Sequence, residues 1–496
     1  MSIRILLCSA AVLYFSWYAW KNWFVSLCAV VVLMAFLQHP DMPHSIAGIQ
    51  GLNPWNVLMG NVLWAWWVRR KQQGLIWDMP RHVKIMFLMY LFVIVWGFFR
   101  LAFDFAPLEA AAVDPDMADY TGREGHYTLA WVISEYLINC VKWFLPGVLF
   151  FDACRTRRRM EISVYVLLSL YLLIALQVVK HMPLGSVMMS GDDLARLSAR
   201  VLLRSVGYYR TELSMLFSGA SWACLAAAIL LPKRRDRLLC LLAGTIILLA
   251  QGETGGRAGY VTWGLIGLVL CLVRWRAYLP LLPVGIICIG IMFPAVQERM
   301  LAGFISSGGP PGSSATIDEF TITSGRVVAW SYVIPKIWDA PFIGYGRQAM
   351  IRIGLWQKIL ESQGEGETFP HPHNAYLEVL LDNGFVGFVL VMPFYIFIVW
   401  QSIKIFHDRS DPLFCAVGGA SLTLVLGLLI AAMASESFYP KESSLGMFVA
   451  IGLMLRLYVQ RRNALATSGP LFEDEGDEVL EAELLPEERE MDETPA

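Results

Sequence analysis

The sequence predicts an all-α, polytopic membrane protein, and three features of its 496 residues support this fold class. The chain is 56% apolar and 16% charged, whereas a soluble domain is about 45 to 50% apolar and about a quarter charged. Its apolar residues are gathered in long segments that are separated by short polar ones. Basic residues recur in every second polar connection. Because lipid offers backbone groups no hydrogen-bond partner, each long apolar segment is expected to be a helix.

Thirteen apolar stretches are long enough, or nearly long enough, to cross a bilayer. The first two are short and are joined only by Lys21 and Asn22, so they form either two spans or one irregular element. We therefore expect a helical bundle of twelve or thirteen spans. The stretches fall at about residues 5–20, 23–38, 52–68, 84–104, 127–152, 161–180, 212–231, 237–252, 257–273, 277–293, 375–400, 412–434 and 442–458.

The basic connections predict the orientation of these spans. Under the positive-inside rule they face the cytoplasm, so the connections between them face outward. Only one outward connection, residues 294–374, is long. The basic connections include residues 69–71, 155–159, 233–237, 274–276, 404–409 and 461–462.

The same pattern divides the chain into four regions. Residues 1–293 and 375–460 hold the N-terminal and C-terminal membrane helices, and residues 294–374 form a long periplasmic loop containing short helices. Residues 461–496 form a tail that becomes strongly acidic after Ser468, so we expect it to be disordered and cytoplasmic. The apolar start of the chain is expected to be a retained membrane anchor, and the nine cysteines, nearly all in apolar segments, are expected to be free thiols.

A glycine-rich sequence, residues 252–259, lies at an outward junction between two spans and contains Glu253 and Arg257. Its glycines let the backbone turn sharply and expose amide groups, and the adjacent arginine can hold an oxyanion through two hydrogen bonds. The alternative is a simple turn whose arginine extends to the membrane surface.

The long outward loop contains Ser324-Gly325-Arg326 and then a turn at residues 341–346 that includes Tyr345. Ser324 and Gly325 can cap a helix in which Arg326 is an early residue. The alternative is an amphipathic helix on the membrane surface, anchored by its tryptophans. Both interpretations are compatible with one another.

A third candidate, His371-Pro372-His373-Asn374, stands where a span leaves the outer face. The free amides of a helix start favour an anion, and a histidine there can act as a general base or hold a phosphate. The alternative is a structural pair that caps the helix. No cysteine or carboxylate set nearby completes a metal site, so no metal ion is expected.

The last candidates are charges in unusual places. Arg196, Arg200 and Arg204 recur at helical spacing on the outward side, with Arg210 close by, and can attract an anionic headgroup or form an amphipathic surface helix. Within one span, Glu135 and Lys142 are either site residues or an ion pair that joins helices, because charges in lipid usually face the bundle interior.

Together these motifs resemble the O-antigen ligase and O-antigen polymerase superfamily, over about residues 204–387. The resemblance implies a membrane glycosyltransferase with a GT-C-like fold. Such an enzyme would need no metal ion or other cofactor. It would act at the periplasmic face of the bacterial inner membrane on a glycan linked to undecaprenyl diphosphate. The residues that carry it are Gly256-Arg257-Ala258, Ser324-Gly325-Arg326 with Pro341 and Gly344-Tyr345-Gly346, and His373-Asn374-Ala375-Tyr376 with Gly384 and Gly387.

The resemblance also implies roles for these residues. Arg257 and Arg326 would bind the diphosphate, and His373 would orient or deprotonate the acceptor hydroxyl, with inversion at the anomeric carbon. Where many relatives have an asparagine-rich stretch, residues 208–212 read Tyr-Tyr-Arg-Thr-Glu, which leaves the acceptor open. The further substrate-binding candidates are Arg204, Arg210, His371, Asn374, Glu253 and Tyr345.

Three acceptors fit the motifs: a second lipid-linked glycan, a lipid A core, or a protein side chain. The first two are favoured, because no large outer domain is available to recognise a protein. From a different class, the chain could be a transporter that flips a lipid-linked oligosaccharide. A transporter has no evident need for the long outer loop with Arg326 and two histidines. Membrane lipids are expected partners and nucleic acid is not.

Overall fold

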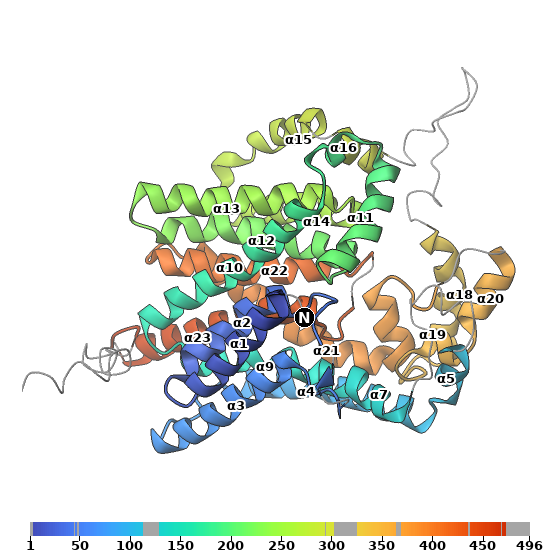
Figure 1. The fold of residues 1–496 in the computed structure, drawn as a ribbon, viewed down its shortest axis with the longest axis horizontal. Coiled ribbons are helices and arrows are strands. Elements are labelled where there is room, and N and C mark those ends of the chain that lie inside the picture. Colours follow the sequence, from blue (N-terminus) through green and yellow to red (C-terminus); the bar gives the residue numbers. More distant parts are fainter. Residues whose placement is uncertain are drawn as a thin grey trace, which may run out of the picture.

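The protein is a bundle of helices in a computed structural model (Figure 1). The structure describes residues 3–43, 45–46, 49–112, 128–292, 294–301, 325–363, 369–434, 437–467 and 469–472. Among them, the two-residue strands β1 (Ser45–Ile46) and β2 (Ile49–Gln50) form one small antiparallel pair. The predicted all-α class is therefore confirmed.

Every predicted span contains a helix. Seven helical segments are long and apolar enough to cross a membrane, judged by length and composition alone: α4 (Arg81–Phe103), Leu129–Ala153, α10 (Arg157–His181), Arg210–Leu230, α21 (Ala375–His407), α22 (Pro412–Ala431) and Glu442–Thr467. Three shorter apolar helices are α1 (Ile3–Tyr18), α2 (Trp23–Leu37) and α14 (Arg257–Val273). The remaining predicted spans correspond to α3 (Pro54–Gln72), α13 (Arg234–Glu253) and α15 (Leu281–Met292).

Three of these segments consist of more than one helix. They are Leu129–Ala153, with α7 (Leu129–Ile133), the π-helix η1 (Ser134–Ile138), α8 (Asn139–Lys142) and α9 (Leu145–Ala153); Arg210–Leu230, with α12 (Arg210–Ala227) and η3 (Ala228–Leu230); and Glu442–Thr467, with η5 (Glu442–Ser444) and α23 (Leu445–Thr467).

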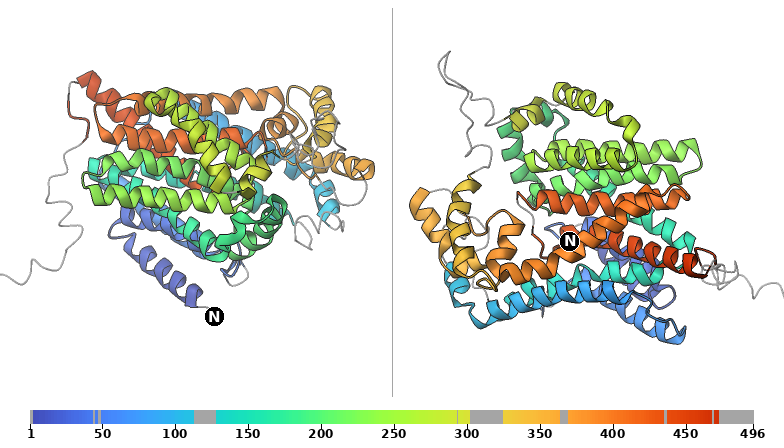
Figure 2. Two further views of the ribbon diagram at one scale, coloured as in Figure 1. Left: turned by 90° about the horizontal axis from the view of Figure 1, so that it is seen from above. Right: turned by 180° about the vertical axis from the view of Figure 1, so that it is seen from behind.

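Short helices occupy the connections. Figures 1 and 2 show α18, α19 and α20 together with α5 at one end of the bundle, which we call the α18 end. Apolar side chains of α18, α19 and α20 form a small core of their own against α21. The short helices are α5 (Ala106–Ala112), η2 (Leu184–Met188), α11 (Gly191–Ser205), η4 (Arg276–Tyr278), α16 (Pro294–Leu301), α18 (Arg326–Asp339), α19 (Ala349–Arg352) and α20 (Leu355–Gln363).

The predicted region boundaries need one adjustment. Helix α23 continues to Thr467, beyond the predicted end of the C-terminal membrane helices at residue 460. The acidic tail from residue 473 onward lies outside the described residues, as do Ser324 and residues 302–323 of the long loop.

The predicted basic connections meet at the other end of the bundle, which we call the basic end. Arginines at this end pair with aspartates from other segments of the chain, and this holds distant helices together. The pairs are Arg70–Asp152 at 2.5 Å, Arg456–Asp78 at 2.6 Å, Arg157–Asp411 at 2.5 Å and Arg461–Asp408 at 2.5 Å.

Helix α12 lies inside the bundle, between α22, α13 and α14. Small residues allow its neighbours to approach closely. A Cβ atom at Gly219 would lie 2.8 Å from the Thr423 carbonyl oxygen, and one at Gly259 would overlap Ser214. The close packing of α12 and α14 brings their N-terminal ends together, and these ends form part of the candidate site.

Candidate active site

Two groups of basic side chains adjoin the first turn of α12. We call them the arginine cluster and the histidine cluster. The arginine cluster consists of Arg210, Arg257 and Arg299; the histidine cluster consists of His371, His373, Arg326 and Lys441.

The arginine cluster is built at two helix starts. Arg210 is the first residue of α12 and donates a hydrogen bond from Nη1 to the Gly255 carbonyl oxygen at 3.2 Å. Gly255 has a φ of +64°, a conformation that favours glycine, and it turns the chain into α14. Arg257 is the first residue of α14. The predicted turn therefore brings two separately predicted arginines to one place.

The start of α14 is well suited to an anion. Its N-cap residue, Gly256, has no side chain to bond the first amides of the helix. Ser214 of α12 packs against Gly256 and donates to its carbonyl oxygen at 3.2 Å. The N-terminal amides and the helix dipole of α14 favour negative charge, and the start of α12 adds a second dipole.

Arg299 of α16 completes the cluster and was missed by the sequence analysis. Its charge interacts with those of both Arg210 and Arg257. Its Nη1 pairs with Asp192 at 2.5 Å, while its buried Nε has no hydrogen-bond partner within the part of the chain that is described. Arg299 therefore brings a third guanidinium group close to those of Arg210 and Arg257 in a partly buried place, and a bound anion would offset this concentration of positive charge.

Glu253 is placed differently from the other candidates. It is the last residue of α13, is fully buried, and both its carboxylate oxygens are without a hydrogen-bond partner among the described residues. Tyr260 donates to the Gly252 carbonyl oxygen at 2.7 Å and holds the turn from the other side. Glu253 therefore lies inside the glycine-rich turn, not on its accessible surface.

The histidine cluster is held by a tight turn before α21. His373 has a φ of +49°, and its backbone amide donates to Nδ1 of His371 at 3.3 Å. The two imidazole rings have centroids 4.0 Å apart. Trp330 of α18 donates to the Pro372 carbonyl oxygen at 2.9 Å, which ties this turn to the helix that Arg326 begins.

Both imidazoles are neutral at neutral pH. Burial, with smaller contributions from Lys441 and Arg326, lowers the pKa of His371 to about 4. Burial, with His371, Arg326 and Lys441, holds the pKa of His373 well below its ordinary value. Both residues keep part of their surface exposed. A neutral, accessible imidazole can accept a proton.

Lys441 and Glu212 connect the two clusters. Nζ of Lys441 lies 3.4 Å from Oε1 of Glu212, and Oε2 of Glu212 accepts from the Tyr209 amide at 3.3 Å. Glu212 follows Arg210 by two residues, which is about 3 Å along a helix axis. Lys441 was also missed, although both it and Arg299 are basic residues in predicted outward connections, where the positive-inside rule makes basic residues unusual.

The glycines of the remaining motif dock the outer helices on α21. Gly384 interrupts α21 with a φ of +64°, and the Phe385 amide donates to the Pro341 carbonyl oxygen at 2.7 Å. The Tyr345 amide donates to the Leu381 carbonyl oxygen at 2.9 Å. A side chain at Gly344 would overlap the α21 backbone. These glycines therefore fix the position of the short helices relative to the histidine cluster.

Three of the predicted substrate-binding residues, Arg204, Asn374 and Tyr345, lie outside both clusters or make structural contacts. Arg204 is exposed on α11 like Arg196 and Arg200, and the structure does not bring it into the arginine cluster. Asn374 is the N-cap of α21, and its Oδ1 accepts from the amides of Tyr376 at 3.0 Å and Leu377 at 3.2 Å. The Tyr345 side chain packs against the small core of the outer helices.

The charges inside the span Leu129–Ala153 are also held by neighbours. Glu135 accepts a hydrogen bond from Asn139 at 2.8 Å within the region of the π-helix. Nζ of Lys142 lies 4.3 Å from the Trp143 ring centroid and 5.6 Å from that of Trp55. Among the described residues, Glu135 and Lys142 therefore do not form the predicted ion pair between helices. Within the described ranges, no group of three or more His, Cys, Asp or Glu could hold a metal ion.

The fold and the two clusters define a polytopic helical membrane protein with a strongly basic site at the α18 end. Residues 238–392 match the family model described as O-antigen ligase. Over this range, about a third of its length, the chain is similar to the O-antigen ligase family. The matched range contains Arg257, Arg299, Arg326 and His373.

Known relatives agree with this family. The chain is 28% identical over 237 residues to an O-antigen ligase of Pseudomonas aeruginosa, covering 47% of this chain and 49% of the relative. It is 32% identical over 110 residues to a ComP-specific O-oligosaccharyltransferase of Acinetobacter baylyi, covering 21% and 19%. It is 21% identical over 214 residues to a putative polysaccharide ligase of Rickettsia conorii, covering 41% and 48%. These matches span about half of each relative's length or less.

Proposed function

We propose that the protein is an inverting glycosyltransferase that moves a glycan from an undecaprenyl-diphosphate donor to an acceptor hydroxyl. The single observation that carries this proposal is that the arginine and histidine clusters adjoin the same helical turn of α12. One cluster suits an anionic leaving group and the other holds a neutral base. The O-antigen ligase domain supports the same chemistry.

The arginine cluster would bind the donor diphosphate. Arg210, Arg257 and Arg299 provide three guanidinium groups beside the starts of α12 and α14. Guanidinium groups bind phosphate oxygens in pairs, and a helix start adds amide donors. Negative charge grows on the leaving diphosphate as the glycosidic bond breaks, so this site would stabilise the transition state more than the ground state.

The histidine cluster would activate the acceptor. The acceptor oxygen attacks the anomeric carbon, the bond from that carbon to the diphosphate oxygen breaks with its electron pair, and the hydroxyl proton passes to the His373 imidazole. Direct displacement inverts the anomeric carbon. Arg326 and Lys441, whose charges act on the His373 imidazole, would hold the nearer phosphate.

This mechanism predicts an unusual pH dependence. In free enzyme the lowered pKa of His373 keeps it unprotonated below pH 6.5, so kcat/KM should stay constant as pH falls through about 6.5 and decline only at lower pH. Bound diphosphate would offset Arg326 and Lys441 and raise the pKa of His373. The kcat profile should therefore decline at a higher pH than the kcat/KM profile. Initial rates over about pH 4.5 to 8 test this.

Lys441 supplies the internal check on this pH dependence. Lys441→Gln removes a positive charge that lowers the pKa of His373, so the decline in kcat/KM should move to higher pH. An unchanged decline in this variant, or a wild-type decline near pH 6.5, contradicts His373 as the base.

We infer that the acceptor is a glycan or a lipid-linked glycan, as in surface polysaccharide assembly at the periplasmic face of a bacterial inner membrane. The longer match, to an O-antigen ligase, supports this acceptor class. A protein acceptor is the second candidate, because the shorter and more identical match is to an O-oligosaccharyltransferase.

The decisive experiment is product analysis with purified protein. Undecaprenyl-diphosphate-linked glycan is incubated in detergent with the protein alone, with lipid A core, or with a candidate acceptor protein. Chain lengthening without added acceptor identifies a polymerase, and transfer to lipid A core or to protein identifies those acceptors. If no glycosidic bond forms under any condition, but the donor crosses the wall of a reconstituted vesicle, the protein is a transporter and our proposal is wrong.

A further inference from the structure

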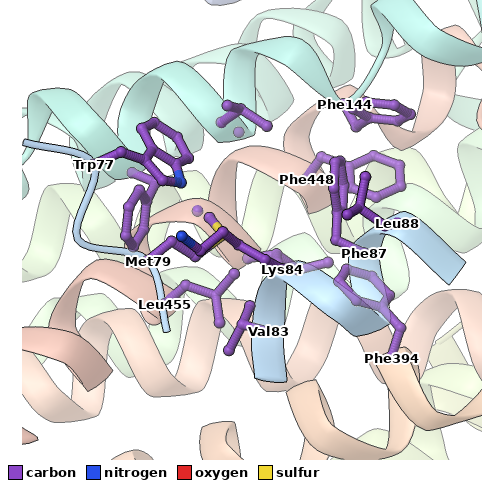
Figure 3. Close-up of a pocket in the computed structure, with 15 residues that line it drawn as sticks. Trp77, Met79, Val83, Lys84, Phe87, Leu88, Phe144, Phe394, Phe448 and Leu455 are labelled. Atoms are coloured by element: carbon purple, nitrogen blue, oxygen red, sulfur yellow. The ribbon is translucent and has the colours of Figure 1, made fainter. Parts of the chain in front are cut away.

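A second, apolar site lies away from both clusters. It is a cavity of about 180 Å³ between α4, α9, α21 and α23 (Figure 3). Trp77 and Met79, from the connection that precedes α4, also line it. Its walls are almost entirely apolar, and five of the lining side chains are phenylalanines: Phe87, Phe144, Phe151, Phe394 and Phe448. Pockets with such walls bind apolar ligands.

One charged residue, Lys84, lines this cavity. Lys84 belongs to the first turn of α4, and Figure 3 shows its amine extended into the cavity, toward Trp77 and Met79. Within the described residues, no carboxylate pairs with Lys84 and no oxygen accepts a hydrogen bond from it. By contrast, the neighbouring arginines Arg70 and Arg155 both pair with Asp152, at 2.5 and 2.9 Å.

The position of the cavity indicates where it opens. The first turn of α4 lies at the basic end, because Asp78 just before it pairs with Arg456 at 2.6 Å. Leu88, which lines the cavity one turn beyond Lys84, is 59% exposed. The cavity therefore opens on the exposed side of α4, where lipid would surround the protein. Under the positive-inside rule, the basic end lies at the cytoplasmic leaflet, so the cavity opens toward the lipids of that leaflet.

We propose that this cavity binds one acyl chain of an anionic glycerophospholipid, whose phosphate pairs with the Lys84 amine. A wholly apolar occupant would leave that ammonium group facing hydrocarbon without a partner, which is costly. A chain with an anionic headgroup matches both the apolar walls and the single cation at their polar end. The arginine cluster lies at the opposite end of the bundle, so this lipid is distinct from the glycan donor.

The proposal is tested by native mass spectrometry of the purified protein in mixed micelles of phosphatidylglycerol and phosphatidylcholine at equal concentration. The wild-type protein should retain phosphatidylglycerol about fivefold over phosphatidylcholine, the preference that one interfacial lysine gives. Lys84→Gln should abolish this preference. Leu88→Trp, which places an indole at the exposed rim, should reduce retention of both lipids, and Val148→Trp should do so from the α9 wall.

Matched controls separate the cavity from the rest of the surface. Lys404→Gln removes another lysine of the basic end, one that stands over Trp400, and Leu241→Trp adds an indole to the exposed face of α13. Both should behave like the wild-type protein, and all variants should keep its melting temperature. Equal retention of the two lipids by wild type, an unchanged preference in Lys84→Gln, or full retention by both tryptophan variants overturns the proposal. So does displacement of the bound lipid by undecaprenyl diphosphate.

Discussion

Replacing His373 by alanine should lower kcat by about a thousandfold, the usual contribution of a general base. The imidazole is neutral, partly exposed and fixed by the turn that joins it to His371. The other neutral imidazole of the cluster, His371, accepts a hydrogen bond from the His373 amide through Nδ1, and the Glu212 carboxylate pairs with Lys441. The measurement is single-turnover glycan transfer from the lipid-linked donor.

Two comparisons separate a chemical role from a structural one. His407→Ala removes a histidine at the other end of α21, where Nδ1 lies 2.9 Å from the Val273 carbonyl oxygen, and should leave transfer unchanged. Donor affinity of His373→Ala should stay close to that of wild type, because the arginine cluster is intact. A folded His373→Ala protein that keeps more than about a tenth of the wild-type kcat would exclude His373 as the base.

The fold was largely predictable because hydrophobicity alone determines which segments enter lipid. All thirteen predicted spans contain helices, since backbone amides in lipid have no other partners. The internal breaks were not predictable in this way. The π-helix Ser134–Ile138 lies inside one apolar segment, and Gly384 bends α21 through its contact with the turn after Pro341. Such breaks depend on tertiary contacts, and the hydropathy of a segment carries no information about these.

The residues of the site were predictable from the sequence only where they belong to a recognisable motif. Arg257, Arg326 and His373 stand in distinctive local sequences, and the structure gives each of them charged neighbours. Arg299 and Lys441 stand in no motif, and only the packing of α16 and of the segment before η5 brings them to the clusters. A rule that flags every basic residue in an outward connection would have found both.

The same rule would have selected residues outside the site. Arg196, Arg200 and Arg204 are also basic and predicted to face outward, but they lie on the exposed face of α11, whose buried face packs Leu194, Ala195, Ser198 and Leu202. Helical spacing alone could not decide which face of α11 turns inward.

The second large effect should come from Arg257. Arg257→Ala should lower kcat/KM by about a hundredfold to a thousandfold, the loss typical of removing one donor from a preorganised oxyanion site. Arg257→Lys keeps the charge but loses the paired hydrogen bonds, so its loss should be intermediate. Steady-state kinetics with the lipid-linked donor at fixed acceptor measure both variants. Arg235→Ala is the control. Arg235 is exposed in the first turn of α13, at the end of that helix away from Glu253, so this variant should keep the wild-type kcat/KM.

Arg299 makes this prediction specific to the cluster. Its Nη1 is already paired with Asp192 and its Nε is unpartnered among the described residues, so Arg299→Ala should also lower kcat/KM but by less than Arg257→Ala. If both side chains hold one diphosphate, the double variant should lose less than the product of the two single losses, because residues that share a partner are not additive. Losses that multiply independently would mean that Arg299 does not contact the donor, and an active Arg257→Ala protein would remove the arginine cluster from the mechanism altogether.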